Sequence, residues 1–421
     1  MQIQQEPETA TEISFLELTP YQEIFYNEWL LQPLRCDYSM VMDQVVAGNL
    51  DIERVDKSIK RLLNSYRLMT SNIKRSADKI GWVRRKPISD FGNFMILHDR
   101  ELTEDEILQL VQKPFDLEND MLARMHIIKL SNGQYRIIKI LHHILIDGLS
   151  CKTTYDEMEL FYNNTEYFNR VSLEEQEHLH HKLASDLNQI LAENKSVMQD
   201  FWKKHMKGLS GPDLKFLKDN TPTGIALTRN MISEFRFSFN EDTFVRVRQL
   251  TRGYRLTPYI FGQFVFGIII HKMSGQDAIG VSFPTAILEG KELIFGAHIN
   301  SILLPFRFNE NTTVQNLVDD ILAFYGELKN SKAKYLPVHE ILKFAESGGL
   351  MDIGFVQTDL KDNAVAYDDT EHIEIRNDLN IDVSNSLIFE QEVRDNQINY
   401  RVRYNNRELN GTLVNSFVSL Y

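Results

Sequence analysis

The sequence contains very little cysteine, with only Cys36 and Cys151 among its 421 residues. Two thiols cannot form a framework of disulfides, and no Cys-x-x-Cys spacing suggests a zinc site. We therefore expect two reduced thiols and no bound metal. The amino terminus, MQIQQEPETATE, lacks the basic start and apolar core of a secretory signal. This absence predicts a cytoplasmic protein.

Long hydrophobic runs and dense positive charge are also missing. The longest apolar stretch, residues 259–270, is too short to cross a bilayer and contains the polar Gln263. The chain has 46 Lys and Arg against 59 Asp and Glu, a net charge of −13, and its densest basic run is only Val83–Lys86. Such a chain repels nucleic acid and anionic lipid, so we expect neither as a partner. A cationic amine suits the charge better.

Apolar residues make up 43% of the chain and charged residues 25%, which is typical of a globular protein. The length favours two lobes, each with its own core. Strand-like and helix-like patterns are mixed in both halves, which indicates the α/β class. The patterns predict strands over residues 39–46, 121–130, 135–141, 232–239 and 278–283, and helices over residues 18–31, 50–68, 150–161, 241–254 and 257–273.

Changes in composition divide the chain. We expect a disordered tail over residues 1–15, a first lobe over 16–170 and a second lobe over 226–421. The segment between them, 171–225, is polar and rich in charge, which predicts long solvated helices followed by a linker.

Two histidines and an Asp-Gly pair stand together in residues 141–150, LHHILIDGLS. The dipeptide Asn132-Gly133 predicts a tight hairpin before them, so the second strand carries His142 and His143 to its far end. Neighbouring side chains of a strand face opposite sides, and only one of the two histidines can therefore reach a given site. Gly148 then turns the chain, and Ser150 is predicted to cap the next helix.

This stretch resembles the core motif of condensation domains of nonribosomal peptide synthetases, and the likeness extends over the chain from about residue 16. Further segments carry it. They are residues 18–29 with Gln22, 48–68, 200–208 (DFWKKHMKG), 257–280, 295–307 (FGAHINSILLPFR) and 400–421.

The resemblance implies an α/β fold of two chloramphenicol-acetyltransferase-like lobes, arranged as a V with a tunnel at their junction. It implies that His143 lies where an amine attacks a thioester carbonyl, as a base or as a positioning group. His142 and Asp147 would hold the turn, with Asp147 in a buried ion pair. Gly148 would permit the turn and direct its backbone N–H at the developing oxyanion.

The family commonly has arginines that pair with the motif aspartate, but this sequence has Leu68-Met69 and Thr285-Ala286 in the matching places. A buried carboxylate without a partner is costly. Asp147 would then need another cation, such as Arg67 or Lys291, or a hydrogen-bonding neighbour.

Several polar residues are weaker candidates. Asn300 and Ser301 match a family segment at the lobe crossover, and with Ser150 they either support the reacting groups from behind or are structural. His178, His180 and His181 lie in the charged segment without a second cluster, so solvation explains them better than metal binding.

The chain contains neither an adenylation domain nor a carrier-protein segment, so we expect a stand-alone or terminal domain. Such domains resemble the amine-accepting amide synthases of the vibriobactin and rhabdopeptide type, which release a carrier-bound acyl group onto a free amine. The resemblance implies no bound cofactor, because the donor is carried on the phosphopantetheine arm of an acyl- or peptidyl-carrier protein. It also implies a monomer.

Three alternatives stay open. The acceptor could be an aminoacyl carrier protein, the enzyme could be a coenzyme A-dependent acyltransferase of the wider HxxxD type, or the domain could recruit partners without catalysis. The doubled histidine argues against the second. The presence of His143, Asp147 and Gly148 argues against the third.

Overall fold

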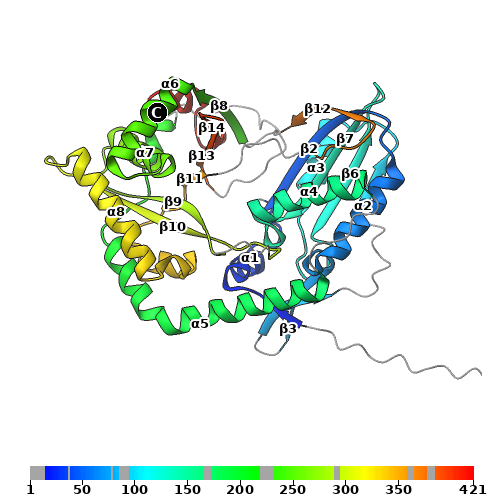
Figure 1. The fold of residues 1–421 in the computed structure, drawn as a ribbon, viewed down its shortest axis with the longest axis horizontal. Helices are drawn as coiled ribbons and strands as arrows, with labels where there is room; N and C mark the ends of the chain where they lie inside the picture. The colour runs from blue at the N-terminus through cyan, green and yellow to red at the C-terminus, as the bar shows by residue number, and fades with distance from the viewer. Residues whose placement is uncertain are drawn as a thin grey trace, which may run out of the picture.

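The computed structural model describes residues 15–36, 38–76, 79–84, 94–164, 172–218, 232–288, 294–357, 365–376 and 385–421. These residues form two lobes that stand side by side as a V (Figure 1), each built on one large sheet with helices packed against it. Each lobe has its own hydrophobic core. The expected mixture of helices and strands is confirmed.

The N-terminal lobe contains a five-stranded sheet in the order β12-β2-β7-β6-β5. Its strands are β2 (Ser39–Gly48), β5 (Met95–His98), β6 (Ala123–Lys129), β7 (Tyr135–His142) and β12 (Thr370–Arg376). Helices α2 (Ile52–Ser65), α3 (Glu104–Val111) and α4 (Gly148–Asn163) belong to this lobe, and 3-10 turns η1 (Arg67–Thr70) and η3 (His143–Leu145) follow α2 and β7. A small sheet of β1 (Phe15–Glu17), β4 (Lys79–Arg84) and β3 (Ser71–Ser76) adjoins it.

The C-terminal lobe contains a six-stranded sheet in the order β10-β9-β11-β13-β14-β8. Its strands are β8 (Ile232–Phe239), β9 (Ala278–Ala286), β10 (Ile299–Arg307), β11 (Ile353–Gln357), β13 (Leu387–Arg394) and β14 (Gln397–Asn405). Its helices are α6 (Glu241–Tyr254), α7 (Pro258–Ser274), α8 (Val314–Asn330), α9 (Val338–Ile341) and α10 (Gly411–Val418), with 3-10 turns η4 (Leu214–Leu217), η5 (Ala333–Tyr335) and η6 (Leu342–Phe344). Among the helices described, none combines the length and apolar character needed to span a membrane.

Two helices join the lobes. Helix α5 (Leu173–Met206) is one continuous helix of 34 residues rather than several, and it runs along the base of both lobes (Figure 1). Helix α1 (Pro20–Leu31) lies between the lobes, where Tyr21 packs with Leu187 of α5 and Ile287. The Tyr21 hydroxyl also donates to the carbonyl of Tyr335 in the C-terminal lobe, at 2.8 Å. The start of α1 is therefore tied to α5 and to the C-terminal lobe.

The second half of the chain also contributes to the first lobe. Strand β12 pairs antiparallel with β2, so residues 370–376 complete the N-terminal sheet (Figure 1). The segment before β12 bonds to the same strand, because the side chain of Gln44 exchanges two hydrogen bonds with the backbone of Val365. A division of the chain near residue 225 therefore separates two stretches of sequence but not two sheets.

The turn between β9 and β10 crosses to the N-terminal lobe in the same way. Phe295 in this turn is 3% exposed, belongs to the N-terminal core and stacks on Tyr66, with ring centroids 4.2 Å apart. Its neighbour Gly296 has φ +146°, and a Cβ there would come within 2.7 Å of the His298 ring. Only glycine suits this conformation.

The tight hairpin expected at Asn132-Gly133 joins β6 and β7. Leu130 N–H bonds to Gln134 C=O, so the loop has three residues, and within it only Gly133 has a positive φ. The expected cap of the next helix is wrong. Helix α4 starts at Gly148 and is capped by Asp147, not by Ser150. Asp147 precedes the helix, and its carboxylate accepts the N–H of Ser150, which is the third residue of α4 and therefore lies past the N-cap position.

We predict that Phe295→Ala lowers the free energy of unfolding by about 3 kcal/mol, because it empties a filled site in the core of the opposite lobe. Urea unfolding followed by circular dichroism would measure this. The control is Leu34→Ala, whose side chain is 82% exposed and should leave the midpoint unchanged. An unchanged midpoint for Phe295→Ala would show that the turn does not hold the lobes together.

Candidate active site

The His-His and Asp-Gly residues lie where β7 ends and α4 begins, beside the crossing turn between β9 and β10. Strand β7 ends at His142, and His143 starts the 3-10 turn η3. The backbone N–H of His143 donates to the carbonyl of Tyr38 at 2.8 Å, which anchors the turn to the residue before β2. The backbone around both histidines is therefore held on each side.

His142 is a buried structural residue. Its Nδ1 accepts the backbone N–H of Ile144 at 3.1 Å. Its ring packs edge-to-face with Phe115 and Tyr38, with ring centroids 5.9 and 6.1 Å apart. Burial, with a smaller contribution from the neighbouring His143, lowers the pKa of His142 to about 3. The ring is thus neutral near pH 7, with its proton on Nε2.

His143 is the histidine that reaches open space. Its ring is partly exposed and stacks on Phe25 of α1, with centroids 5.3 Å apart and planes at 22°. Nδ1 is buried and has no hydrogen-bond partner among the described residues. The accessible nitrogen is therefore Nε2. The sequence interpretation missed Phe25, because nothing in the pattern of α1 distinguishes this residue from its other apolar neighbours.

Asp147 joins the two lobes without an ion pair. Its Oδ1 accepts the N–H of Ser150 at 2.9 Å, and its Oδ2 accepts the N–H of His298 at 3.1 Å. No cation among the described residues pairs with Asp147. Arg67 pairs instead with Glu177 at 2.5 Å, and Lys291 lies outside the described residues. Two backbone N–H groups satisfy the carboxylate in place of an arginine.

Ser150 and Gly148 complete this connection. The Ser150 hydroxyl donates to the carbonyl of Gly296 at 3.1 Å and accepts the N–H of the same residue at 3.2 Å. Gly148 has no positive φ, and a Cβ there would meet nothing within 4 Å. The expectation that the turn requires a glycine at this position is therefore wrong. The N–H groups of Gly148 and Leu149, in the first turn of α4, have no acceptor among the described residues.

Asn300 lies inside the C-terminal lobe. Its Nδ2 donates to the carbonyls of Lys334 and Leu336, and its Oδ1 accepts the N–H of Val338. All three bonds fasten β10 to the loop before α9. Ser301 is partly exposed, lies in the β9–β10 ladder opposite Pro284, and its hydroxyl has no hydrogen-bond partner among the described residues. The contacts of Asn300 are those of a structural residue.

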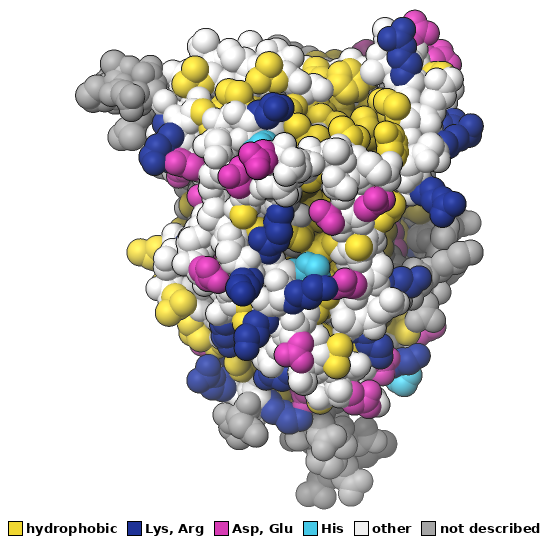
Figure 2. All heavy atoms as spheres, turned by 90° about the vertical axis from the view of Figure 1, so that its left-hand side faces the viewer, with side chains coloured by type: hydrophobic (Ala, Val, Ile, Leu, Met, Phe, Trp, Pro, Cys, Tyr) yellow, Lys and Arg dark blue, Asp and Glu magenta, His cyan; other side chains and the backbone are white. Residues whose placement is uncertain are grey.

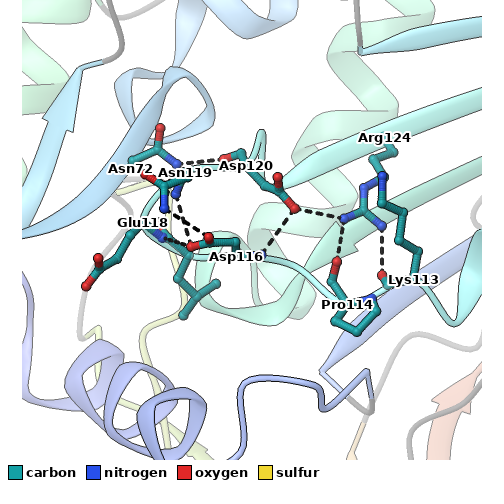
Figure 3. Close-up of polar contacts among 9 residues, drawn as sticks. Asn72, Lys113, Pro114, Asp116, Glu118, Asn119, Asp120 and Arg124 are labelled. Atoms are coloured by element: carbon teal, nitrogen blue, oxygen red, sulfur yellow. Dashed lines mark hydrogen bonds and ion pairs between the residues drawn. The ribbon is translucent and has the colours of Figure 1, made fainter.

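The sequence interpretation missed a polar network around Arg124, which Figure 3 shows. The network surrounds Phe115, whose ring packs on His142. Arg124 of β6 donates to the carbonyls of Lys113 and Pro114 at 2.7 Å each and pairs with Asp120 at 3.3 Å. Its guanidinium lies 3.9 Å from the ring centroid of Phe115, which in turn contacts His142. An arginine within an apolar strand was the available sign of this network.

The same loop is tied to two other elements. Asn72 of β3 donates to the carbonyl of Asp120 at 2.6 Å, and Asp116 accepts the N–H groups of Glu118 and Asn119 (Figure 3). Glu118 accepts the hydroxyl of Tyr26 from α1 at 2.7 Å. The loop therefore couples α1, β3 and β6 around the ring that packs on His142.

Two further buried histidines, His180 and His298, lie at the lobe junction. His180 of α5 bonds through Nε2 to the carbonyl of Glu17, and its ring centroid is 5.9 Å from that of His298. Both rings are 1% exposed, and burial lowers the pKa of His298 to about 4 and that of His180 to about 3. His178 and His181 are exposed. No group of three or more metal-binding side chains occurs among the described residues.

A surface hollow of about 280 Å³ lies on the C-terminal lobe, between β10, α8 and the end of α5. Figure 2 shows this side of the molecule, where Lys and Arg side chains are interspersed with Asp and Glu. In the hollow, Glu327 pairs with Lys204 at 2.7 Å and with His205 at 3.0 Å. The charged side chains that line the hollow therefore pair with one another, and none of its lining residues belongs to the histidine motif.

Comparison with known proteins shows which family and which solved structures this chain is similar to. A family model described as Condensation domain matches residues 12–414. Bacitracin synthase 3 of Bacillus licheniformis is 22% identical over 352 residues, which cover 80% of this chain and 5% of that protein. The chain thus spans only a small part of this curated relative.

Solved structures share the fold. A four-domain nonribosomal peptide synthetase, holo-AB3403 bound to AMP and glycine, superposes with a TM-score of 0.75 at 16% identity, over 98% of this chain and 33% of that one. The condensation domain from the monacolin K polyketide synthase MokA gives 0.70 at 14% identity, over 97% and 96%. These likenesses confirm the expected fold of two acetyltransferase-like lobes.

We predict that Arg124→Met lowers the free energy of unfolding by about 2 kcal/mol, because it leaves two partly buried carbonyls without donors. Urea unfolding would measure the change. Arg100→Met is the matched control, since Arg100 also pairs with a carboxylate but is largely exposed and should leave the midpoint unchanged. Equal midpoints for both variants would contradict the role of the network.

We also predict a pH-dependent stability at the junction. A histidine with a lowered folded-state pKa stays neutral while the unfolded chain takes up protons, so stability is complete above about pH 6.5 and is lost as pH falls towards 4. For His298 the loss amounts to about 3 kcal/mol. The variant His298→Phe should flatten the curve of unfolding free energy against pH in this window. His178→Phe is the exposed control, and an unchanged curve for both would contradict the prediction.

Proposed function

The chain belongs to the condensation-domain family of nonribosomal peptide synthetases, and from this we propose that it joins a carrier-bound acyl or peptidyl group to an amine. Members of the family are acyltransferases that form amide bonds in nonribosomal peptide synthesis. In the proposed reaction the donor is a thioester on the phosphopantetheine arm of a partner carrier protein. The acceptor is a small free amine or a polyamine.

His143 is the catalytic residue of this proposal. The observation that carries it is the contrast between the two histidines. The ring of His142 is buried and hydrogen-bonded, whereas the ring of His143 is partly exposed and its Nε2 has no hydrogen-bond partner among the described residues. A neutral imidazole can accept a proton from an attacking ammonium or hold the amine by a hydrogen bond. Stacking on Phe25 limits how the ring can turn.

The start of α4 can stabilise the negative charge that forms during attack. As the amine nitrogen bonds to the thioester carbon, the carbonyl oxygen becomes an oxyanion, and the C–S bond then breaks to release the carrier thiol. The N–H groups of Gly148 and Leu149 point out of the first turn of a 16-residue helix and lack acceptors among the described residues. We assign them to the oxyanion. Asp147, Ser150 and His142 position these groups.

The net charge of −13 supports a cationic acceptor, because it raises the local concentration of amines around the protein. An aminoacyl carrier protein is the second candidate for the acceptor. It is supported by the relatives, since bacitracin synthase 3 is a far longer protein of which the matched part forms 5%.

We predict that the intact protein forms an amide from an acyl-loaded carrier protein and at least one free amine, and that His143→Ala lowers the rate about 100- to 10,000-fold. Mass spectrometry of the product across a panel of mono-, di- and polyamines would measure this. His178→Ala, an exposed histidine on α5, is the matched control and should retain full activity.

Other outcomes separate the alternatives. Product with an aminoacyl carrier protein but with no free amine would replace the free-amine acceptor with a carrier-bound one. Product with acyl-coenzyme A in place of the loaded carrier would point to the wider acyltransferase type. Equal rates for the wild type and His143→Ala would contradict the role of His143.

A further inference from the structure

Lys139 is a charged residue in the middle of an apolar sheet. It stands on β7, the central strand of the N-terminal sheet, opposite Met42 of β2 and Met125 of β6. Its side chain is nevertheless partly exposed. The ammonium therefore faces a solvent-accessible space that lies among protein atoms.

The surroundings of the Lys139 ammonium are apolar. It lies 4.4 Å from the ring centroid of Tyr155 on α4, and Cys151, one turn earlier on α4, contributes to its electrostatic environment. The sulfur of Cys151 is 4.0 Å from that of Met42, which closes the side between α4 and β2. These side chains form a wall suited to an alkyl chain.

No protein anion balances this charge among the described residues. Asp43 is next to the position opposite Lys139 in the register, but it is bound by Arg136 at 2.7 Å. Asp147 is used by two backbone N–H groups, and the exposed Asp156 pairs with Lys152 at 2.5 Å. Lys139 itself makes no hydrogen bond or ion pair with them.

A cation enclosed by apolar side chains without a balancing anion is costly to fold, and sites of this kind occur preferentially where a protein binds or transforms a ligand. Burial lowers the pKa of Lys139 to about 7, since the nearby groups offer only slight compensation. Lys139 precedes His143 by four residues on the same strand and turn, a span of roughly 13 Å. An extended substrate could therefore reach from one to the other.

We propose that Lys139 binds a carboxylate of the substrate and thereby selects an acid-bearing reactant. This inference rests on the proposed function, because it names the chemistry of one of the two reactants. The carboxylate can be the far end of a dicarboxylic acyl chain on the carrier protein or the acid group of an amino-acid acceptor. The apolar wall of Met42, Cys151 and Tyr155 matches the methylene groups of either.

A binding experiment tests the site without any turnover. Isothermal titration of the wild type and of Lys139→Met with octanoate and with 1-octanol compares a carboxylate with a neutral probe of equal length. We expect octanoate to bind the variant about 10- to 100-fold more weakly, with 1-octanol unaffected. Lys152→Met, an exposed lysine of α4, is the matched control. The variant should be no less stable than the wild type, because a desolvated charge is removed.

A turnover experiment then identifies which reactant carries the acid. Octanoyl- and suberyl-loaded carrier proteins are each paired with hexylamine and with 6-aminohexanoate. A preference for the suberyl donor that Lys139→Met reduces about 10- to 100-fold assigns the carboxylate to the donor. The same reduction for 6-aminohexanoate over hexylamine assigns it to the acceptor.

The outcomes distinguish the two proposals. Wild-type binding of octanoate no tighter than that of 1-octanol, together with unchanged substrate preferences in Lys139→Met, overturns the carboxylate site and leaves the proposed function intact. Loss of octanoate binding in Lys139→Met without turnover of any pair overturns the proposed function and leaves the site.

Discussion

The carboxylate of Asp147 is the interaction on which the arrangement of the site depends. One oxygen caps α4 in the N-terminal lobe, and the other accepts the N–H of His298 from the turn between β9 and β10. Ser150 adds two bonds to Gly296 in the same turn. A single buried acid therefore sets both the start of the helix and the position of the opposite lobe, with His143 four residues before it.

The buried histidine rings near the junction of the lobes are neutral, whereas the amine of Lys139 is accessible to solvent. His142, His180 and His298 are buried deeply enough that their pKa values fall far below neutrality, so they act as polar packing residues rather than as cations. Lys139 also has a lowered pKa, but its partly exposed side chain faces solvent-accessible space. The difference is one of solvent access. A buried histidine ring stays neutral because no anion can reach it, whereas the accessible amine of Lys139 can keep its proton when an anion binds beside it.

The lobes are interlocked rather than joined end to end. Strand β12 completes the N-terminal sheet, Phe295 fills a site in the N-terminal core, and α5 spans both lobes along their base. Each of these contacts joins residues more than a hundred positions apart. The turn at Gly296 and His298 is the part of the C-terminal lobe that bonds directly to the histidine motif.

The sequence by itself determined the periodic elements, the α/β class and the place of His142, His143 and Asp147 at the end of a strand, because these depend on local spacing. It left open whether a cation or a hydrogen-bonding neighbour satisfies Asp147, since the donor from His298 lies 151 positions away. The supporting ring of Phe25, the Arg124 network and the unbalanced charge of Lys139 were likewise decided only by the tertiary structure. The burial of a side chain and the partners that it contacts depend on residues far away in the sequence, and only the packing of the folded chain brings these residues together.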